Sequence, residues 1–546
     1  MDTDVPLAID PASLPRDPEV LVELIAQLLV ELRKRDGRIE DLEHRMHLLL
    51  RRLYGGTSEK LDPAQLALFD TTPEEPVPEL PPISSSTRPT PHAGAAKKPG
   101  HGRRRLPDRL KRVKVVHDLT PAEKELLGGE ANLVLIGQEE TEQLEWEPSS
   151  LYVIQHVQLT YARRDPLPTN ETLDDEHSIG QRRTKNVITA AKPPQPIPGG
   201  LPGPGLMAHV ATSKYVDHVP LNRQERQFTR HGVFLARQTT CDWALAGAAL
   251  LAALYELLKR EVLRSDVVHV DATSVKIRHA QKRLKHTGYF WTYAGDDQHA
   301  LVAFECTPTH SRDGPAAFLR DFRGYLQADA HSVYDGLYID GRIVEVGCWM
   351  HARRGFFEAR ALDRLRTETA LAYIGRLYAG DRKLAEQIAG EWRELPRDDR
   401  HARIAAVRQE QSQPVLEEFF PWLEAEAPKL LPKNPVRQAM DYALRQRVAL
   451  LRYCEDGRLA IDNGVAERAL RGIALGRRNW LFCGSERGAR AACVYFSLAA
   501  SCLRHEIDPF AYLRDLFTRM PVLLADRDGR PSDEELRPLL PDRWLP

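Results

Sequence analysis

The order of elements between residues 267 and 351 limits the possible folds more than any other feature of this sequence. A β-branched run at 267–277 precedes two aromatic and β-branched segments, 287–295 and 299–307, which a turn-forming Gly-Asp-Asp-Gln sequence joins. A short helix, GPAAFLRDFRG, then leads to a brief strand, GYLQADA, and to a further strand, RIVEVGCWMHARRGFFE. We therefore expect a domain of strands and helices whose sheet begins with a meander.

Two acidic residues lie on strands that this order makes neighbours. Three strands followed by helix, strand, helix and strand is the order of an RNase H-like core, in which the first and fourth strands lie side by side. Asp271 lies on the first strand and Asp329 follows the fourth, so the two carboxylates could approach each other. Two hard oxygen ligands at close range favour Mg²⁺ or Mn²⁺.

A third carboxylate is supplied much later in the chain. Residues 361–455 have a helical, charged pattern and interrupt the expected core before its last element, IDNGVAERALRGIALGRRNW. Asp462 or Asn463 suits the N-cap of this helix, and Glu467 borders its apolar face at about 3.6 residues per turn. That face comprises Val465, Ala466, Ala469, Leu470, Ile473 and Ala474. Spacing alone is compatible with a metal-binding set of three carboxylates and with ordinary surface or capping carboxylates.

Changes in composition divide the 546 residues into several domains, a multidomain α/β organisation. We expect a coiled coil and helical region at 1–70, a Pro-rich then basic linker at 71–110, a small β module at 111–195, a helical region at 196–262, the first part of the core at 263–360, a helical insertion at 361–455, the completion of the core at 456–520 and a C-terminal tail at 521–546. In 196–262 the pattern predicts two helices around His231 and Gly232. A helix-turn-helix contact with DNA is the alternative there to plain helical support.

The N-terminal region carries a heptad pattern. Apolar residues recur at alternating spacings of four and three between residues 21 and 53, and only Arg35 breaks the series. Flanking Glu, Arg and Lys residues favour a two-stranded coiled coil, through which the chain would form a homodimer or a higher oligomer. A long helix packed on its own protein is the alternative, because Arg35 and Gly37 weaken the middle of the pattern.

A basic stretch follows the Pro-rich linker, although the formal net charge of the whole chain is only -1. Nine Lys or Arg residues and one Asp fall between Lys97 and Lys114. Such a cluster on a linker attracts phosphates without reading base sequence, and a merely solvated linker is equally compatible with it. The candidate DNA-binding residues of this stretch are Lys97, Lys98, Arg103, Arg104, Arg105, Arg109, Lys111 and Arg112.

Cysteine content and hydropathy favour a cytoplasmic protein. The seven cysteines are scattered, odd in number and without a Cys-x-x-Cys pair, which suits free thiols in a reducing cytosol. The segment MDTDVPLAIDP lacks the basic and then apolar pattern of a signal peptide. The longest apolar stretch, 243–258, contains Glu256 and is short for a membrane span, so it predicts a buried helix and no membrane partner.

Several long segments, in the same order, resemble the insertion-sequence transposases of family sixty-six, a DDE-type family. They are RRLYGGTSEKLDPAQLALFD, PIPGGLPGPGLMAHVATSKYVDHVPLNRQE, HVDATSV, GYLQADAHSVYDGL, VGCWMHARRGFFEAR and DNGVAERALRGIALGRRNWLFCGSERGARAA. The resemblance implies that Asp271, Asp329 and Glu467 are the catalytic carboxylates, and that they hold two Mg²⁺ or Mn²⁺ ions about 3.5–4 Å apart. It also implies that 361–455 is the insertion domain of the family.

The resemblance extends to further residues with supporting roles. His269, His351, Asn463 and Arg468 lie in matching motifs and are candidates to orient a ligand or to contact the scissile phosphate, with a structural polar role as the alternative. Arg477 and Arg478 follow Glu467 among interleaved aromatic residues, which suits phosphate contact, although a solvated basic face is the default. The partners implied are the DNA ends of a mobile element, target DNA and small companion proteins.

Two departures from the family pattern bear on activity. The β module at this place in the family carries Cys-x-x-Cys pairs, but this chain has no cysteine before Cys241, and His117, His156 and His177 are widely spaced. Zinc is therefore not expected in the module, because structural zinc sites need four Cys or His ligands. The family sequence His-x-Asp-Glu-Thr has Ala272 after Asp271 here, and its Asn pair has Gly464 after Asn463.

The sequence thus favours a DNA transposase that cleaves and joins the ends of an insertion sequence. A non-catalytic DNA-binding relative that dimerises through 21–53 is the alternative from another class. A nuclease with the same metal ions but without strand transfer is a further alternative. Retention of all three carboxylates favours catalysis.

Overall fold

The computed structural model describes residues 106–545 except 109, 148–149, 165–182, 185–186, 279–284 and 528. All of these belong to one compact unit, Arg103–Pro546. The coiled coil predicted at 21–53 lies outside the described residues, as do Lys97, Lys98, Arg103, Arg104, Arg105 and Arg109.

The centre of this unit is a mixed five-stranded sheet with the strand order β10-β9-β6-β7-β8. Its strands are β6 (Val267–Arg278), β7 (Lys285–Ala294), β8 (Val302–Thr307), β9 (Gly324–Gln327) and β10 (Ile343–Val346). The first three form an antiparallel meander, β9 lies parallel to β6, and β10 lies parallel to β9. The short helix α8 (Asp313–Phe318) connects the meander to β9. The sheet therefore has its first and fourth strands side by side, as the element order predicted.

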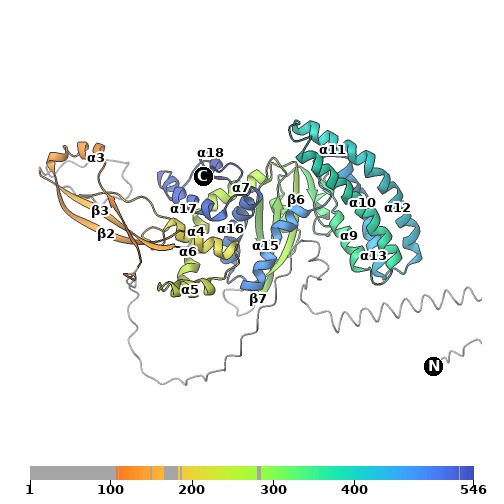
Figure 1. Cartoon of the computed structure of the whole chain (residues 1–546), viewed down its shortest axis with the longest axis horizontal. Helices are drawn as coiled ribbons and strands as arrows, with labels where there is room; N and C mark the ends of the chain where they lie inside the picture. Colours follow the sequence, from red (N-terminus) through yellow and green to blue (C-terminus); the bar gives the residue numbers. More distant parts are fainter. Residues whose placement is uncertain are drawn as a thin grey trace, which may run out of the picture. The chain divides into compact units, whose positions relative to one another are not determined.

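Long helices from the C-terminal part of the chain pack on this sheet. They are α15 (Gly464–Trp480), α16 (Glu486–Arg504) and α17 (Pro509–Asp526), followed by the short α18 (Asp533–Leu536). Figure 1 shows α15 and α16 beside β6 and β7, and both helices contribute to the largest apolar core together with Trp291 and Tyr293 of β7. Leu536, Leu539 and Leu540 are buried in the same core, so the residues expected as a tail at 521–546 pack against the body of the unit.

The segment around His351 differs from the sequence prediction. It was expected to continue the strand RIVEVGCWMHARRGFFE, but β10 ends at Val346 and Cys348 caps helix α9 (Trp349–Glu358). The strand prediction for 348–357 is therefore wrong. Trp349, Ala352 and Phe356 are spaced as on one helical face and are all buried, which explains why this stretch is helical.

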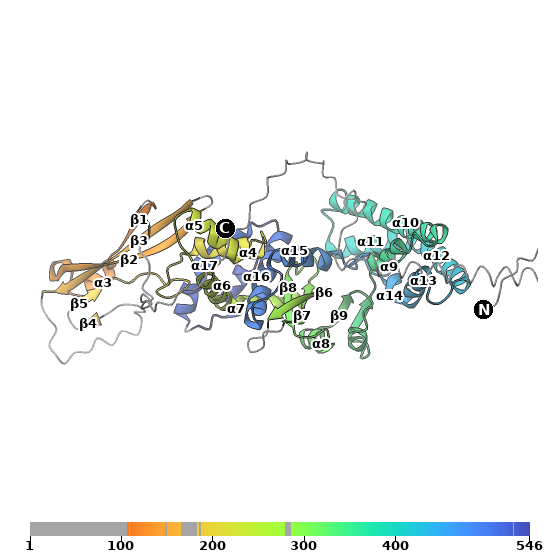
Figure 2. The same cartoon turned by 90° about the horizontal axis from the view of Figure 1, so that it is seen from below.

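The insertion is helical throughout its described residues. It contains α10 (Arg364–Ala389), α11 (Arg397–Gln411), α12 (Gln413–Glu426), α13 (Pro435–Arg445) and α14 (Arg447–Leu451). Helices α10, α12, α13 and α14 share a second apolar core with α9, Val267 and Val346, so the insertion packs on the β9–β10 side of the sheet (Figure 2). Ile404 of α11 packs in a smaller cluster with Leu384 and Trp392. Buried Arg408 of α11 pairs with Asp381 of α10 at 2.8 Å and donates to the carbonyl oxygens of Tyr453 and Leu459. This pairing fixes the segment that leads into α15.

The helical region before the sheet has more breaks than the sequence predicted. Instead of two helices it contains α4 (Pro204–Tyr215), α5 (Leu221–Arg230), α6 (Arg237–Leu250) and α7 (Ala252–Val262). His218 with φ of 59° and the helix-ending sequence before Pro220 separate α4 from α5. Gly232 with φ of 79° separates α5 from α6. No single described helix is long and apolar enough to cross a membrane, and the pair α6 and α7 that together reaches that length is bent by 54°.

A separate sheet precedes these helices. It contains β1 (Arg112–His117), β2 (Leu133–Glu147), β3 (Ser150–Arg163), β4 (Arg183–Thr184) and β5 (Val187–Thr189), with the small helix α3 (Pro121–Leu126) after β1. The long strand β3 is central, because β2 pairs along one edge while β1 and β5 share the other. Thr120 and Glu123 form a capping box that begins α3.

The buried Glu145 of β2 joins this sheet to the helical region. Its carboxylate accepts the backbone N–H groups of Trp146 and Leu206, each at 2.7 Å, and thereby caps the N-terminus of α4. A Cβ at Gly203 would lie 2.2 Å from the Glu145 Oε2, and a Cβ at Gly205 would lie 2.2 Å from the Trp146 carbonyl oxygen. Glycine at positions 203 and 205 therefore allows the start of α4 to pack closely against β2.

Candidate functional site

The pairing of β6 with β9 brings two of the predicted carboxylates to neighbouring positions. The parallel register aligns His269 with Gln327. Asp271 lies two residues beyond His269, and Asp329 lies two residues beyond Gln327, where β9 ends, so both carboxylates follow this aligned pair at the same offset. Neighbouring strands lie about 4.8 Å apart, so the two side chains can reach one another when they leave the sheet on the same face.

Glu467 approaches this pair from helix α15. The structure confirms the expected apolar face of the helix, with Ala466, Leu470 and Ile473 buried and Glu467 partly exposed at its border. Asn463 occupies the N-cap position, while Asp462 accepts the Gly464 N–H at 2.9 Å. Both residues named as N-cap candidates thus take part in beginning the helix. Asn463 also donates through its side chain to the Val270 carbonyl oxygen of β6, at 2.6 Å. This bond ties the start of α15 to the strand that carries Asp271.

The three carboxylates influence each other electrostatically. Burial raises the pKa of Asp271 to about 7, and the negative charges of Asp329 and Glu467 act in the same direction. The Ala272 N–H, which donates to the Asp271 Oδ1 at 2.7 Å, opposes this rise, as does the nearby Arg354. Three half-buried acids close to one another are unfavourable when all of them are charged, so the arrangement suits a bound cation.

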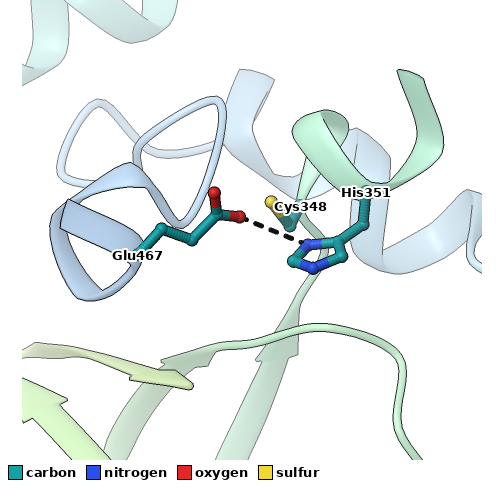
Figure 3. A group of neighbouring side chains, drawn as sticks. All are labelled: Cys348, His351 and Glu467. Carbon is teal, nitrogen blue, oxygen red and sulfur yellow. Dashed lines mark ion pairs between the residues drawn. The ribbon is translucent and has the colours of Figure 1, made fainter. Parts of the chain in front are cut away.

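His351 lies against Glu467. Its Nδ1 is 3.6 Å from the Glu467 Oε1, and Cys348 lies beside both (Figure 3). The Nδ1 of His351 and the Oε1 of Glu467 are each buried and have no hydrogen-bond partner in the described part of the chain. Burial lowers the pKa of His351, which favours a neutral imidazole able to accept a bond or hold a metal ion.

His269 is fully enclosed on β6, two residues before Asp271 and hence on the same face of the strand. Burial lowers the pKa of His269 to about 4, and the positive charge of Arg504 acts in the same direction. The imidazole is therefore neutral at physiological pH. Its Nδ1 has no hydrogen-bond partner among the residues described, and it lines a cavity between the sheet and the insertion helices.

The predicted arginines of α15 occupy different surroundings. Arg468 is exposed and lines a cavity of about 390 Å³ together with His218 and Arg504. Arg477 donates to the Ser274 carbonyl oxygen of β6, and Arg478 is exposed on the last turn of the helix. Arg223 of α5 bonds Asn479 at 3.0 Å and so joins the helical region to the same end of α15.

The described residues of the basic stretch also differ from one another. Lys111 is exposed. Arg112 forms an ion pair with Glu142 at 2.9 Å and donates to carbonyl oxygens of 106–110, so it links the start of β1 to β2. In the same module His117 and His156 meet on paired strands, with Nε2 and Nδ1 2.9 Å apart, although they are widely spaced in sequence.

The two departures from the family pattern have simple surroundings. Ala272 pairs with Trp291 of β7, and strand alternation directs its side chain away from the face of Asp271. A Cβ at Gly464 would lie 2.8 Å from the Asp462 Oδ1 and 2.9 Å from the Arg468 Nη1. A larger residue at 464 would therefore require the ends of the Asp462 and Arg468 side chains to shift.

The structure adds residues that the sequence did not single out for this site. Cys348 and Arg354 lie three residues before and three residues after His351, at the start of and within α9. Residues three apart lie on the same side of a helix, so a helix prediction for this stretch would have placed the three together. His310 stacks on Trp291 with ring centroids 4.9 Å apart, and the charge of Asp329 acts on it. No spacing rule connects His310 with Asp329, because only the fold brings the two together.

Comparison with known proteins shows the family of the chain. A family model described as "Transposase IS66 family" matches residues 199–491, and one described as "Transposase C of IS166 homeodomain" matches residues 41–115. The uncharacterized protein y4hP of Sinorhizobium fredii (strain NBRC 101917 / NGR234) is 29% identical over 502 residues, which cover 88% of this chain and 85% of that protein. The uncharacterized protein y4qI of the same organism is 29% identical over 428 residues, covering 76% of this chain and 72% of that protein. Because the first family model spans more than half of the sequence, the chain belongs to the IS66 family of transposases.

Proposed function

We propose that this chain is a DDE-type transposase that cleaves the ends of its insertion sequence and joins them to target DNA. The observation that carries the proposal is that Asp329 and Glu467, which are far from Asp271 in sequence, lie close enough for their charges to raise its pKa. The family supports a role as transposase, and these three residues are our candidates for its catalytic group.

An RNase H-like core is the fold that we propose for the catalytic domain. The strand order β10-β9-β6-β7-β8, with an antiparallel meander and two parallel strands, supports this assignment. The helical insertion enters between β10 and α15, so it separates the second carboxylate from the third in sequence and leaves them close in space.

The three carboxylates fit divalent cations. The Glu467 Oε1 is buried without a hydrogen-bond partner in the described structure, and Asp271 lies in the field of two other acids. Asp271, Asp329 and Glu467 would hold two Mg²⁺ or Mn²⁺ ions, which supply charge neutralisation at phosphorus and lower the pKa of an attacking water or 3′ hydroxyl.

The remaining work of the site is positioning by the protein. Attack by an oxygen nucleophile forms a new P–O bond as the bond to the leaving 3′ oxygen breaks, and no covalent protein intermediate is needed. Asn463 holds the start of α15 on β6 and thus fixes Glu467 relative to Asp271. His351, neutral by burial and 3.6 Å from Glu467, is placed to orient that carboxylate, and Arg354 is placed to offset the charge of Asp271. A supporting role for His269, two residues before Asp271 on β6, remains our proposal.

DNA binding is proposed for the basic residues Lys111, Arg468, Arg477 and Arg478, together with the basic stretch that precedes residue 106. The family model that matches 41–115 carries the word homeodomain in its description, which supports DNA contact by that part of the chain. Dimerisation through 21–53 and a need for small companion proteins remain our proposals.

Strand transfer in vitro tests the proposal. Purified full-length protein, DNA that carries the ends of its element and a target plasmid are combined with Mg²⁺ or Mn²⁺. We expect end cleavage and joined products, both lost in Asp271→Asn, while end binding by the variant remains. Asp266→Asn is a matched control, because Asp266 precedes the same strand and pairs with Arg458 on the surface.

Two outcomes would contradict the proposal in different ways. Binding of ends without cleavage by the wild-type chain would favour a non-catalytic DNA-binding relative. Cleavage without joined products, under conditions that keep the 3′ ends intact, would favour a nuclease.

A further inference from the structure

A thiol, an imidazole and a carboxylate meet beside the proposed catalytic group. One ligand atom from each of Cys348, His351 and Glu467 lies within 4.8 Å of the other two. Figure 3 shows the three side chains converging from the first turn of α9 and from α15. Asp271 and Asp329 offer only oxygen, whereas this cluster offers sulfur, nitrogen and oxygen, a donor set that favours softer cations.

The distance between the His351 and Glu467 ligand atoms suits a tetrahedral ion. Ligand atoms about 2.1 Å from a tetrahedral Zn²⁺ are about 3.4 Å from each other. The His351 Nδ1 and the Glu467 Oε1 are 3.6 Å apart, too far for a hydrogen bond, and both atoms are buried without a partner among the described residues. Two atoms at this distance that lack hydrogen-bond partners are better explained as ligands of one ion than as partners of each other.

Burial raises the pKa of the Cys348 thiol to about 12, so the sulfur loses its proton only when a metal ion replaces it. The Cys348 Sγ is fully buried and accepts the backbone N–H of Asn463 at 3.2 Å. Cys348 is also the N-cap residue of α9, and the positive end of a helix stabilises a negative charge there. A metal-bound sulfur commonly has such a second group that orients it.

We propose that Cys348, His351 and Glu467 form a binding site for a soft divalent cation such as Zn²⁺, with a fourth position open to water. The site is distinct from the zinc ribbon that the β module lacks. Binding would replace the S–H bond of Cys348 with a sulfur–metal bond and release the proton to solvent.

Occupation of this site has a consequence for the proposed function. A Glu467 carboxylate that ligates the soft ion beside Cys348 is no longer available to ions held by Asp271 and Asp329. Zn²⁺ would therefore inhibit Mg²⁺-dependent cleavage by competition for one side chain. This consequence rests on the proposed function, whereas binding of Zn²⁺ itself does not.

Zn²⁺ titration of the full-length chain against a chromophoric chelator tests the site without DNA or activity. We expect one tightly bound Zn²⁺ per chain, and an affinity more than about 100-fold weaker in Cys348→Ser and in His351→Gln. Co²⁺ in place of Zn²⁺ should give a sulfur-to-metal charge-transfer absorption that Cys348→Ser abolishes. Unchanged Zn²⁺ affinity in Cys348→Ser, with no sulfur-to-cobalt band in the wild type, would overturn the proposal.

Two control variants separate this site from other thiols and imidazoles. Cys454→Ser removes a buried thiol of the insertion core, and His156→Gln removes one of the two paired imidazoles of the β module. Both should keep the tight Zn²⁺, and its loss in His156→Gln alone would place the ion in the β module instead. Thermal unfolding without metal shows whether each variant folds. If Cys348→Ser does not fold, the Zn²⁺ affinity of His351→Gln decides the test.

Discussion

Glu145, which is buried, and Glu467, which is half-buried, both lie near helix N-termini and differ in whether the protein satisfies their carboxylates. Glu145 accepts two backbone N–H groups at 2.7 Å, from Trp146 and Leu206. Glu467 has an oxygen that is buried and without a partner in the described residues, 3.6 Å from an equally unpartnered His351 nitrogen. A satisfied buried carboxylate holds elements together, whereas an unsatisfied one among other acids indicates a ligand.

The largest effect is expected from removing the charge of the unsatisfied glutamate. Glu467→Gln preserves the size of the side chain and should lower the rate of Mg²⁺-dependent cleavage by more than about 10³-fold. The substitution removes a ligand of the metal ions, which stabilise the transition state by several kcal/mol. Thermal stability in the absence of metal should stay equal or rise, since one of three mutually repelling acids is lost. Cleavage assays and metal-free melting check both parts. If Glu467→Gln lowered the melting temperature but kept cleavage activity, Glu467 would be a structural residue and not a metal ligand.

Removing the satisfied glutamate should act on stability instead. Glu145→Ala leaves the Trp146 and Leu206 N–H groups buried without an acceptor, which costs about 1–3 kcal/mol of unfolding free energy. Glu145→Gln keeps an acceptor oxygen and should cost less. Urea unfolding measures the difference. If Glu145→Ala abolished cleavage at a temperature where the chain stays folded, Glu145 would not be purely structural.

The pH dependence of stability separates the two sites further. Burial raises the pKa of Asp271 to about 7, above the value of about 4 in an unfolded chain. The stability contributed by its bound proton is fully present below pH about 4 and is lost as pH rises through about 7. The metal-free chain should therefore lose stability over this window, less steeply in Asp271→Asn.

Mg²⁺ provides the control for that pH dependence. A bound cation holds Asp271 ionised, so saturating Mg²⁺ should remove its share of the slope and should bind more tightly as pH rises through about 7. Burial also raises the pKa of Glu145, whose share should persist in Mg²⁺ because the satisfied carboxylate binds no ion. Unfolding curves at several pH values, with and without Mg²⁺, measure both. A slope that Mg²⁺ leaves unchanged would count against a metal site at Asp271.

Local patterns and the order of elements predicted more of this molecule than the contacts between distant segments. The periodicity of 465–474 predicted the buried face of α15, and the order of strands placed Asp271 beside Asp329. The same rules placed His351 on a strand, because apolar residues resume at Cys348 and Trp349 after Gly347, and those rules did not end the strand at this glycine. Cys348 was missed as a site residue for that reason. His310 and the pairing of Arg408 with Asp381 depend on tertiary packing that no spacing specifies.

The smallest effects are expected from two arginines that differ in their exposure to solvent. Arg112 is engaged by Glu142 and by backbone carbonyls, whereas Arg478 is exposed at the end of α15. Arg478→Ala should weaken binding of end DNA a few-fold and reduce the slope of log affinity against log salt by about 1, as loss of one phosphate contact predicts. Arg112→Ala should leave that slope unchanged and lower the melting temperature instead, because its partners are inside the β module. Binding isotherms at several salt concentrations distinguish the two, and a reduced slope in Arg112→Ala alone would move the DNA-contacting surface from α15 to the start of β1.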